Sequence, residues 1–152
     1  MPTIVYLQIP SDDIERSKKF YTQLFGWKID KSPEANTPEG MENWSITTTD
    51  HNGKEALGGG MSKRQMPQQQ ITNFIDVKSV DEYSSKAERL GGKVVVPNSS
   101  TRYGYYSVCL DTENNSFQDM RMNQKRTPGK NNFLFYITYL VLITKGFDKY
   151  IT

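Results

Sequence analysis

A chain of 152 residues is long enough to bury the core of an ordinary domain, and its hydrophobic content of 36%, arranged in periodic segments, excludes wholesale disorder. The net charge of +2, with basic and acidic residues interleaved, excludes the concentrated basic stripe with which proteins bind a nucleic-acid backbone. The single cysteine, Cys109, excludes an internal disulfide and a cysteine-cluster metal site.

The first predicted elements are a strand and a helix. Residues 4–9 are a short run with β-branched and aromatic residues that stops at Pro10, which predicts a strand. Either Asp12 or Asp13 can cap the helix that follows. Gly26 predicts the end of this helix, because glycine adopts the left-handed conformation common at helix ends.

Three further strands complete the first half of the chain, over residues 27–30, 44–49 and 55–61. Asn52-Gly53 predicts a hairpin turn between the last two strands, because this pair tolerates the positive backbone angles of such turns. The three consecutive glycines of residues 58–60 weaken a strand. They therefore predict the close approach of another group, which could be a ligand, another strand or another subunit.

The same order of elements then repeats after a polar linker over residues 62–70. Residues 71–77 predict a strand, and residues 80–90 predict a helix that ends at Gly91-Gly92. Three strands follow, over residues 93–96, 103–110 and 116–122. A unit of one strand, one helix and three strands leaves one face of its sheet open, and two such units can enclose a pocket.

Several motifs resemble the glyoxalase/bleomycin-resistance/extradiol-dioxygenase superfamily, also called the vicinal oxygen chelate superfamily. The segment FYTQLFGW of residues 20–27 resembles the family signature FYxxxFGW, and residues 74–81 and 90–94 match its second module. Residues 104–117 resemble the closing GY…DPxGNxF motif, with Thr112 and Asn114 in place of proline and glycine. The resemblance covers residues 3–123. It implies an α+β fold of two βαβββ modules, about 1–62 and 70–123, which form a cupped mixed β-sheet with flanking helices.

The resemblance also implies a divalent metal held by His, Gln and Glu side chains on four strands. On the family pattern these positions fall on Tyr6, Thr72 and Gln118, with the fourth in residues 58–60. None is His, Asp or Glu, and only Gln8, on the same strand face as Tyr6, adds an oxygen donor. We therefore expect no metal and no cofactor. The alternative is a metal-dependent lyase, isomerase or dioxygenase of the same superfamily with unusual ligands.

No catalytic residue is predicted. His51, the only histidine, falls in the predicted hairpin turn, and Cys109 falls in an apolar strand with no activating base nearby in the sequence. We interpret His51 as an exposed turn residue and Cys109 as a buried thiol.

The leading functional prediction is a protein that binds a small organic molecule in the cleft without a metal. Hydroxyl and amide groups suit the orientation of a polar ligand, aromatic rings can form walls, and arginine can bind an anionic group. For Trp44 and the tyrosines, packing between sheet and helix is an equally good interpretation. The predicted ligand-binding residues are Tyr6, Gln8, Trp44, Thr72, Arg102, Tyr105 and Gln118.

Residues 124–152 form a C-terminal extension that the superfamily core does not need. Its apolar run, residues 133–144, is too short to span a bilayer as a helix, and a covered strand or helix is expected instead. We expect this run to support contacts in a homodimer, and a partner-binding module that uses it is the second alternative function. Without a recognisable secretory signal, the expected location is the cytoplasm, with no membrane partner and no nucleic-acid partner.

Overall fold

The computed structural model describes residues 1–32, 42–101 and 104–123. These residues fall into two compact units, one of residues 6–71 and one of residues 72–123 together with residues 1–5. The expectations for Arg102 and for the extension 124–152 with its apolar run lie outside the described residues. Within the described ranges, no helix is long and apolar enough to cross a membrane.

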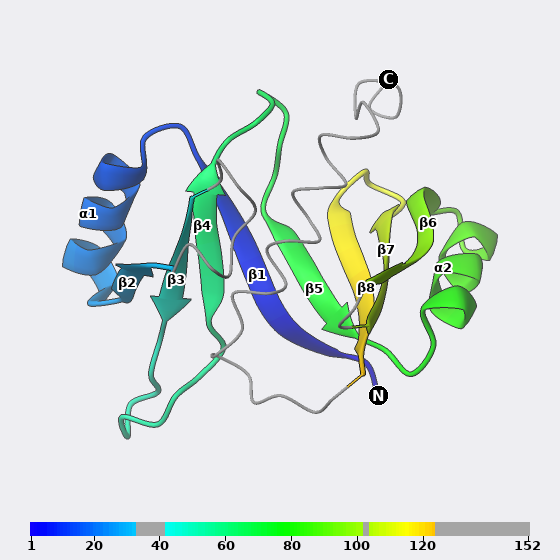
Figure 1. Ribbon diagram of the computed structural model, residues 1–152, viewed down its shortest axis with the longest axis horizontal. Helices are drawn as coiled ribbons and strands as arrows, with labels where there is room; N and C mark the ends of the chain where they lie inside the picture. The colour runs from blue at the N-terminus through cyan, green and yellow to red at the C-terminus, as the bar shows by residue number, and fades with distance from the viewer. Residues whose placement is uncertain (33–41, 102–103, 124–152) are drawn as a thin grey trace. The chain divides into compact units, whose positions relative to one another are not determined.

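The first module is a four-stranded mixed sheet with one helix (Figure 1). The strands lie in the order β2-β3-β4-β1, with β1 and β4 parallel and the other neighbours antiparallel. Helix α1 packs against β2 and β4. The elements are β1 (Thr3–Ser11), α1 (Ile14–Phe25), β2 (Lys28–Lys31), β3 (Asn43–Thr47) and β4 (Gly59–Lys63).

The second module repeats this arrangement. Its strands lie in the order β6-β7-β8-β5, with β5 and β8 parallel and the other neighbours antiparallel. Helix α2 packs against β6, β7 and β8. The elements are β5 (Thr72–Asp76), α2 (Val80–Arg89), β6 (Lys93–Thr101), β7 (Gly104–Leu110) and β8 (Ser116–Met122). The predicted α+β fold of two βαβββ modules is confirmed.

Local sequence sets the ends of α1, as predicted, and it also sets the start of α2 and the turn at Asn114. The Asp13 side chain accepts a hydrogen bond from the Arg16 backbone nitrogen at 2.9 Å, which caps α1, and Gly26 ends it at φ 70°. Ser79 caps α2 in the same way through the Glu82 nitrogen. Asn114 has φ 63°, so it replaces the family's glycine with a residue that tolerates the left-handed region.

Two strands extend past their predicted ends, and each continues through a proline. Strand β1 continues through Pro10, which is in register with Ser62 of β4. Strand β6 continues past Pro97, because the register with β7 shifts between Val96 and Ser99. Proline is tolerated at bulges and on edge strands, and β6 lies at an edge of its module. The predicted ends at residues 9 and 96 were therefore wrong.

The glycine run lies beside other strands of the same module. Strand β4 begins only at Gly59, later than predicted, and Gly59 is in register with Leu7 of β1. A Cβ atom at Gly59 would collide with the backbone oxygen of Leu7, and one at Gly58 would lie 2.7 Å from the backbone oxygen of Ile46. The close approach predicted from these glycines is thus that of neighbouring strands.

The hydrophobic core of the first module lies on the α1 side of its sheet. Because side chains alternate along a strand, Ile9, Trp44 and Met61 share this face. Leu7, Ile14, Tyr21 and Trp27 pack against the same cluster, which also contains Ile29 and Ile46. Tyr6 and Gln8 lie on the opposite face of the sheet.

Candidate functional site

The polar face of the first module centres on Gly60. Tyr6 and Gln8 alternate with the core residue Ile9 along β1, so both lie on the face opposite to it. Gln8 is in register with Gly60, and Asn43 of β3 is in register with Ser62 of β4. We call Tyr6, Gln8, Asn43 and Ser62, with Gly60 between them, the Gly60 cluster.

Side-chain hydrogen bonds connect the cluster. Gln8 Nε2 donates to Asn43 Oδ1 at 3.4 Å and to Ser62 Oγ at 3.2 Å. Asn43 Nδ2 donates to Ser32 Oγ at 3.2 Å. All of these side chains are buried, and Asn43 is fully so. Buried polar networks of this kind hold their members in fixed positions, because each broken bond would leave a desolvated group.

The missing side chain of Gly60 makes room for this cluster. A Cβ atom at Gly60 would collide with Tyr6 Oη and Gln8 Oε1, and it would lie 3.1 Å from Asn43 Oδ1. Three oxygen atoms therefore converge above one glycine. Among the residues that the structure describes, Gln8 Oε1 has no hydrogen-bond partner, although Gln8 is only 2% exposed.

The donor set of the Gly60 cluster does not fit the divalent metal that the family resemblance implies. Burial raises the pKa of the Tyr6 hydroxyl well above its ordinary value, and its hydrogen bond with Asn43 offsets this only in part, so the phenol stays neutral. Amide and hydroxyl groups supply no anionic ligand. No group of three or more His, Cys, Asp or Glu side chains in the described ranges could hold a metal ion.

Thr72 and Gln118, the two buried site residues predicted in the second module, lie on the same face of its sheet. Phe74 of β5 is in register with Gln118 of β8, and Thr72 lies two residues before Phe74. Thr72 Oγ1 donates to Ser116 Oγ at 3.5 Å, and Gln118 is fully buried. Tyr105 is 48% exposed and alternates onto the opposite face from Gln118.

The structure separates Trp44 from the polar residues with which it was grouped. Trp44 lies in the hydrophobic core beneath α1, on the opposite sheet face from Gln8. This placement matches the packing interpretation of Trp44.

Sequence reasoning missed Asn43, Ser62 and the role of Gly60. The glycine run was the signal that could have revealed Ser62, because alternation along the strand places Ser62 on the same face as Gly60.

A second buried polar group lies in the second module. Asp119 of β8 is in register with Ser107 of β7, and Cys109 lies two residues further along β7 on the same face. Asp119 is 3% exposed, and burial raises the pKa of its carboxyl to about 6. Burial, with smaller effects of Asp119 and Glu88, raises the pKa of the Cys109 thiol to about 11. The thiol therefore stays protonated, as expected for a buried and unreactive cysteine.

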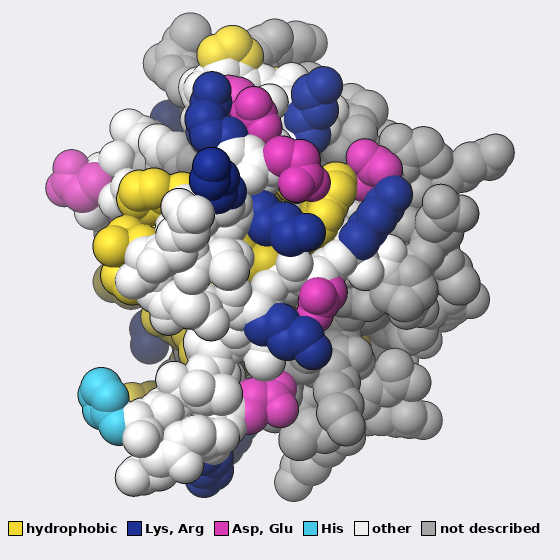
Figure 2. Space-filling view, turned by 90° about the vertical axis from the view of Figure 1, so that its left-hand side faces the viewer, with side chains coloured by type: hydrophobic (Ala, Val, Ile, Leu, Met, Phe, Trp, Pro, Cys, Tyr) yellow, Lys and Arg dark blue, Asp and Glu magenta, His cyan; other side chains and the backbone are white. Residues whose placement is uncertain are grey.

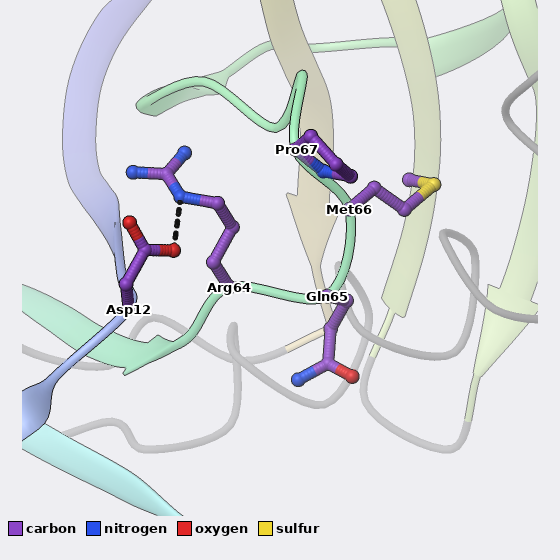
Figure 3. A pocket seen from close by; sticks show the side chains of 5 residues that line it. All are labelled: Asp12, Arg64, Gln65, Met66 and Pro67. Atoms are coloured by element: carbon purple, nitrogen blue, oxygen red, sulfur yellow. Dashed lines mark hydrogen bonds and ion pairs between the residues drawn. The ribbon is translucent and has the colours of Figure 1, made fainter.

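A cavity of about 570 Å³ opens beside the end of β1, lined by Asp12, Arg64, Gln65, Met66 and Pro67 (Figure 3). The Asp12 and Arg64 side chains point toward each other, and Arg64 Nε donates to Asp12 Oδ1 at 2.9 Å. Arg64 Nη1 donates to the backbone oxygen of Gln69, and Nη2 donates to that of Pro10 at 3.4 Å. The guanidinium thus joins the residues after β4 to the end of β1.

We expect Arg64→Gln to lower the free energy of unfolding by about 1–3 kcal/mol, because the hydrogen bonds of a charged donor to two backbone oxygens are lost. The Asp12→Asn control should cost less than about 1 kcal/mol, because it removes only an exposed ion pair. Urea unfolding followed by tryptophan fluorescence measures both. Equal losses for the two variants would show that the ion pair, and not the bonds to the backbone, is the stabilising contact.

Where the residues are described, the face that carries α1 mixes charged side chains of both signs. Figure 2 shows lysine and arginine side chains interspersed with aspartate and glutamate, with small hydrophobic areas between them. Among the described residues, this face offers no basic stripe of the kind that binds a phosphate backbone.

Comparisons with known proteins support the family resemblance. A family model described as bleomycin resistance protein-like N-terminal matches residues 3–37. No curated protein sequence gives a significant match to the chain.

Solved structures share the fold at low sequence identity. A hypothetical protein from Bacillus halodurans C-125 is 10% identical with a TM-score of 0.53, over 83% of this chain and 98% of that chain. A Streptomyces coelicolor methylmalonyl-CoA epimerase variant in complex with 2-nitronate-propionyl-CoA is 11% identical with a TM-score of 0.54, over 83% and 98%. Both alignments cover nearly the whole length of the solved structure that is matched.

Proposed function

We propose that this chain, as a member of the glyoxalase/bleomycin-resistance/extradiol-dioxygenase superfamily, binds a small organic molecule without the superfamily's metal. The observation that carries the proposal is the Gly60 cluster. It places Tyr6 and Gln8, which are neutral hydrogen-bonding groups, on the strand where the family pattern puts a metal ligand. Such groups orient a polar ligand and do not activate water or a substrate oxygen as a metal does.

The chemistry of the cluster also argues for binding over catalysis. A general base near neutral pH needs a group that titrates there, and the cluster consists of a phenol with a raised pKa, two amides and a hydroxyl. Buried polar groups arranged on rigid strands are instead typical of sites that fix the orientation of a ligand. The epimerase complex supports the view that this fold accommodates organic ligands, although its own ligand carries no implication for the ligand of this chain.

A ligand screen on the full chain tests the proposal. We expect purified protein to contain no stoichiometric Ni, Zn, Fe or Mn by elemental analysis, and at least one drug-like or metabolite compound to raise the melting temperature. A ligand at 100 times its dissociation constant adds about 2.7 kcal/mol of stability, which such a screen readily detects.

Variants locate the binding. Tyr6→Phe and Gln8→Met keep the side-chain volume but remove a hydroxyl and an amide, and both should weaken the hit at least about tenfold, the effect of losing roughly 1.4 kcal/mol. Thr48→Val, on an exposed segment of the same module, is the control and should bind like the unmodified chain. Stoichiometric metal, or hits that bind all four proteins equally, would refute the proposal.

A further inference from the structure

We infer that the ligand of the Gly60 cluster is a neutral molecule that presents an N–H or O–H group to Gln8 Oε1; this inference rests on the proposed function. Gln8 is only 2% exposed, yet its side-chain oxygen has no hydrogen-bond partner in the described parts of the chain. A buried acceptor without a donor is unfavourable by about 1–3 kcal/mol, so a ligand that supplies the donor gains affinity from it.

The hydrogen-bond network determines which end of the Gln8 amide is available. Asn43 Nδ2 donates to Ser32 Oγ, so Asn43 Oδ1 faces Gln8. Gln8 Nε2 points toward Asn43 Oδ1, and it also donates to Ser62 Oγ. The remaining atom is the acceptor Oε1, which lies above Gly60. The strand pairing and the asparagine thus leave an acceptor, and not a donor, for the ligand.

The charge of the cluster sets the second part of the ligand class. Three oxygen atoms, from Tyr6, Gln8 and Asn43, converge above Gly60, and none of the cluster residues carries a charge. An anionic group placed there would lose its hydration against acceptor oxygens, with no cation in the cluster to replace the lost water. An ammonium group would be desolvated with no counter-charge. A neutral amide or alcohol meets neither penalty.

Three matched probes test this inference. Benzamide offers N–H donors, N,N-dimethylbenzamide keeps the ring and carbonyl but has none, and benzoate is anionic. We expect benzamide to shift the side-chain amide NMR signals of Gln8 and Asn43, and to bind at least about tenfold more tightly than the other two. In Gln8→Met, benzamide should lose this advantage.

The outcomes distinguish the inference from the function on which it rests. Tighter binding of dimethylbenzamide or benzoate, equal binding of the three probes, or no shift with benzamide would overturn the donor inference, even where the broad screen finds other ligands that depend on Tyr6 and Gln8. An empty broad screen would overturn the proposed function as well. Because the comparison among probes uses the unmodified chain, it holds even if Gln8→Met fails to fold.

Discussion

Replacing Asp119 with asparagine is expected to raise the free energy of unfolding at pH 7.5 by about 1–3 kcal/mol, because it removes a buried charge that forms no ion pair with a described residue. Asp119 is 3% exposed, and its Oδ2 atom has no hydrogen-bond partner in residues 1–32, 42–101 and 104–123. Asparagine has nearly the same shape and remains neutral at every pH. It therefore retains the packing of β8 while removing the ionisation.

The pH dependence gives this prediction its sign. Burial raises the pKa of Asp119 from 3.8 to about 6, so between these values the unfolded chain has lost the proton and the folded chain retains it. Stability contributed by the protonated carboxyl is therefore fully present below about pH 4 and is lost as the pH rises to about 6. The gain in stability of Asp119→Asn over the unmodified chain should grow over this window and then stay constant.

Urea unfolding at pH 4.0, 5.0, 6.0 and 7.5 measures this difference directly. Asp76→Asn on the neighbouring strand β5 is the control, because the Asp76 side chain is 46% exposed and forms only a 3.8 Å ion pair with Arg121. Its stability change should stay within about 1 kcal/mol at every pH. A constant gain for Asp119→Asn across the series, or destabilisation at pH 7.5, would mean that the folded protein stabilises the ionised carboxylate.

Features set by nearby residues were predicted from the sequence, whereas features set by pairing between strands were not. Asp13 and Gly26 mark the ends of α1 because their effects act within one turn of helix. The ends of β1 and β6 were placed too early, because whether Pro10 or Pro97 interrupts a strand depends on the partner strand and its register.

The candidate site shows the same division. Alternation along one strand was enough to place Tyr6 and Gln8 on a common face. Asn43 and Ser62 join them only through the register of β3 with β4, which no single segment of sequence reveals. Trp44 was placed with the ligand-binding residues because the sequence of β3 does not show which of its faces α1 covers.

Gly59→Ala is expected to lower the free energy of unfolding by about 1–3 kcal/mol, the usual effect of forcing an extra carbon into a packed region. The added Cβ would collide with the backbone oxygen of Leu7 and would lie 3.1 Å from its Cδ1 atom. A backbone oxygen held in the parallel pairing of β1 with β4 cannot move aside without disturbing that pairing. Thermal and urea unfolding of the full chain measure the loss.

Gly60→Ala, one residue further along the same strand, is the matched comparison because its Cβ points to the other face. It would meet the ends of the Tyr6 and Gln8 side chains, whose rotation costs less than the displacement of a backbone oxygen, so its loss of stability should be smaller than that of Gly59→Ala. The rotation would, however, break the Gly60 cluster and abolish ligand binding. Gly59→Ala, measured where it is still folded, should bind normally. The reverse pattern would place the ligand on the α1 face of the sheet, and not over Gly60.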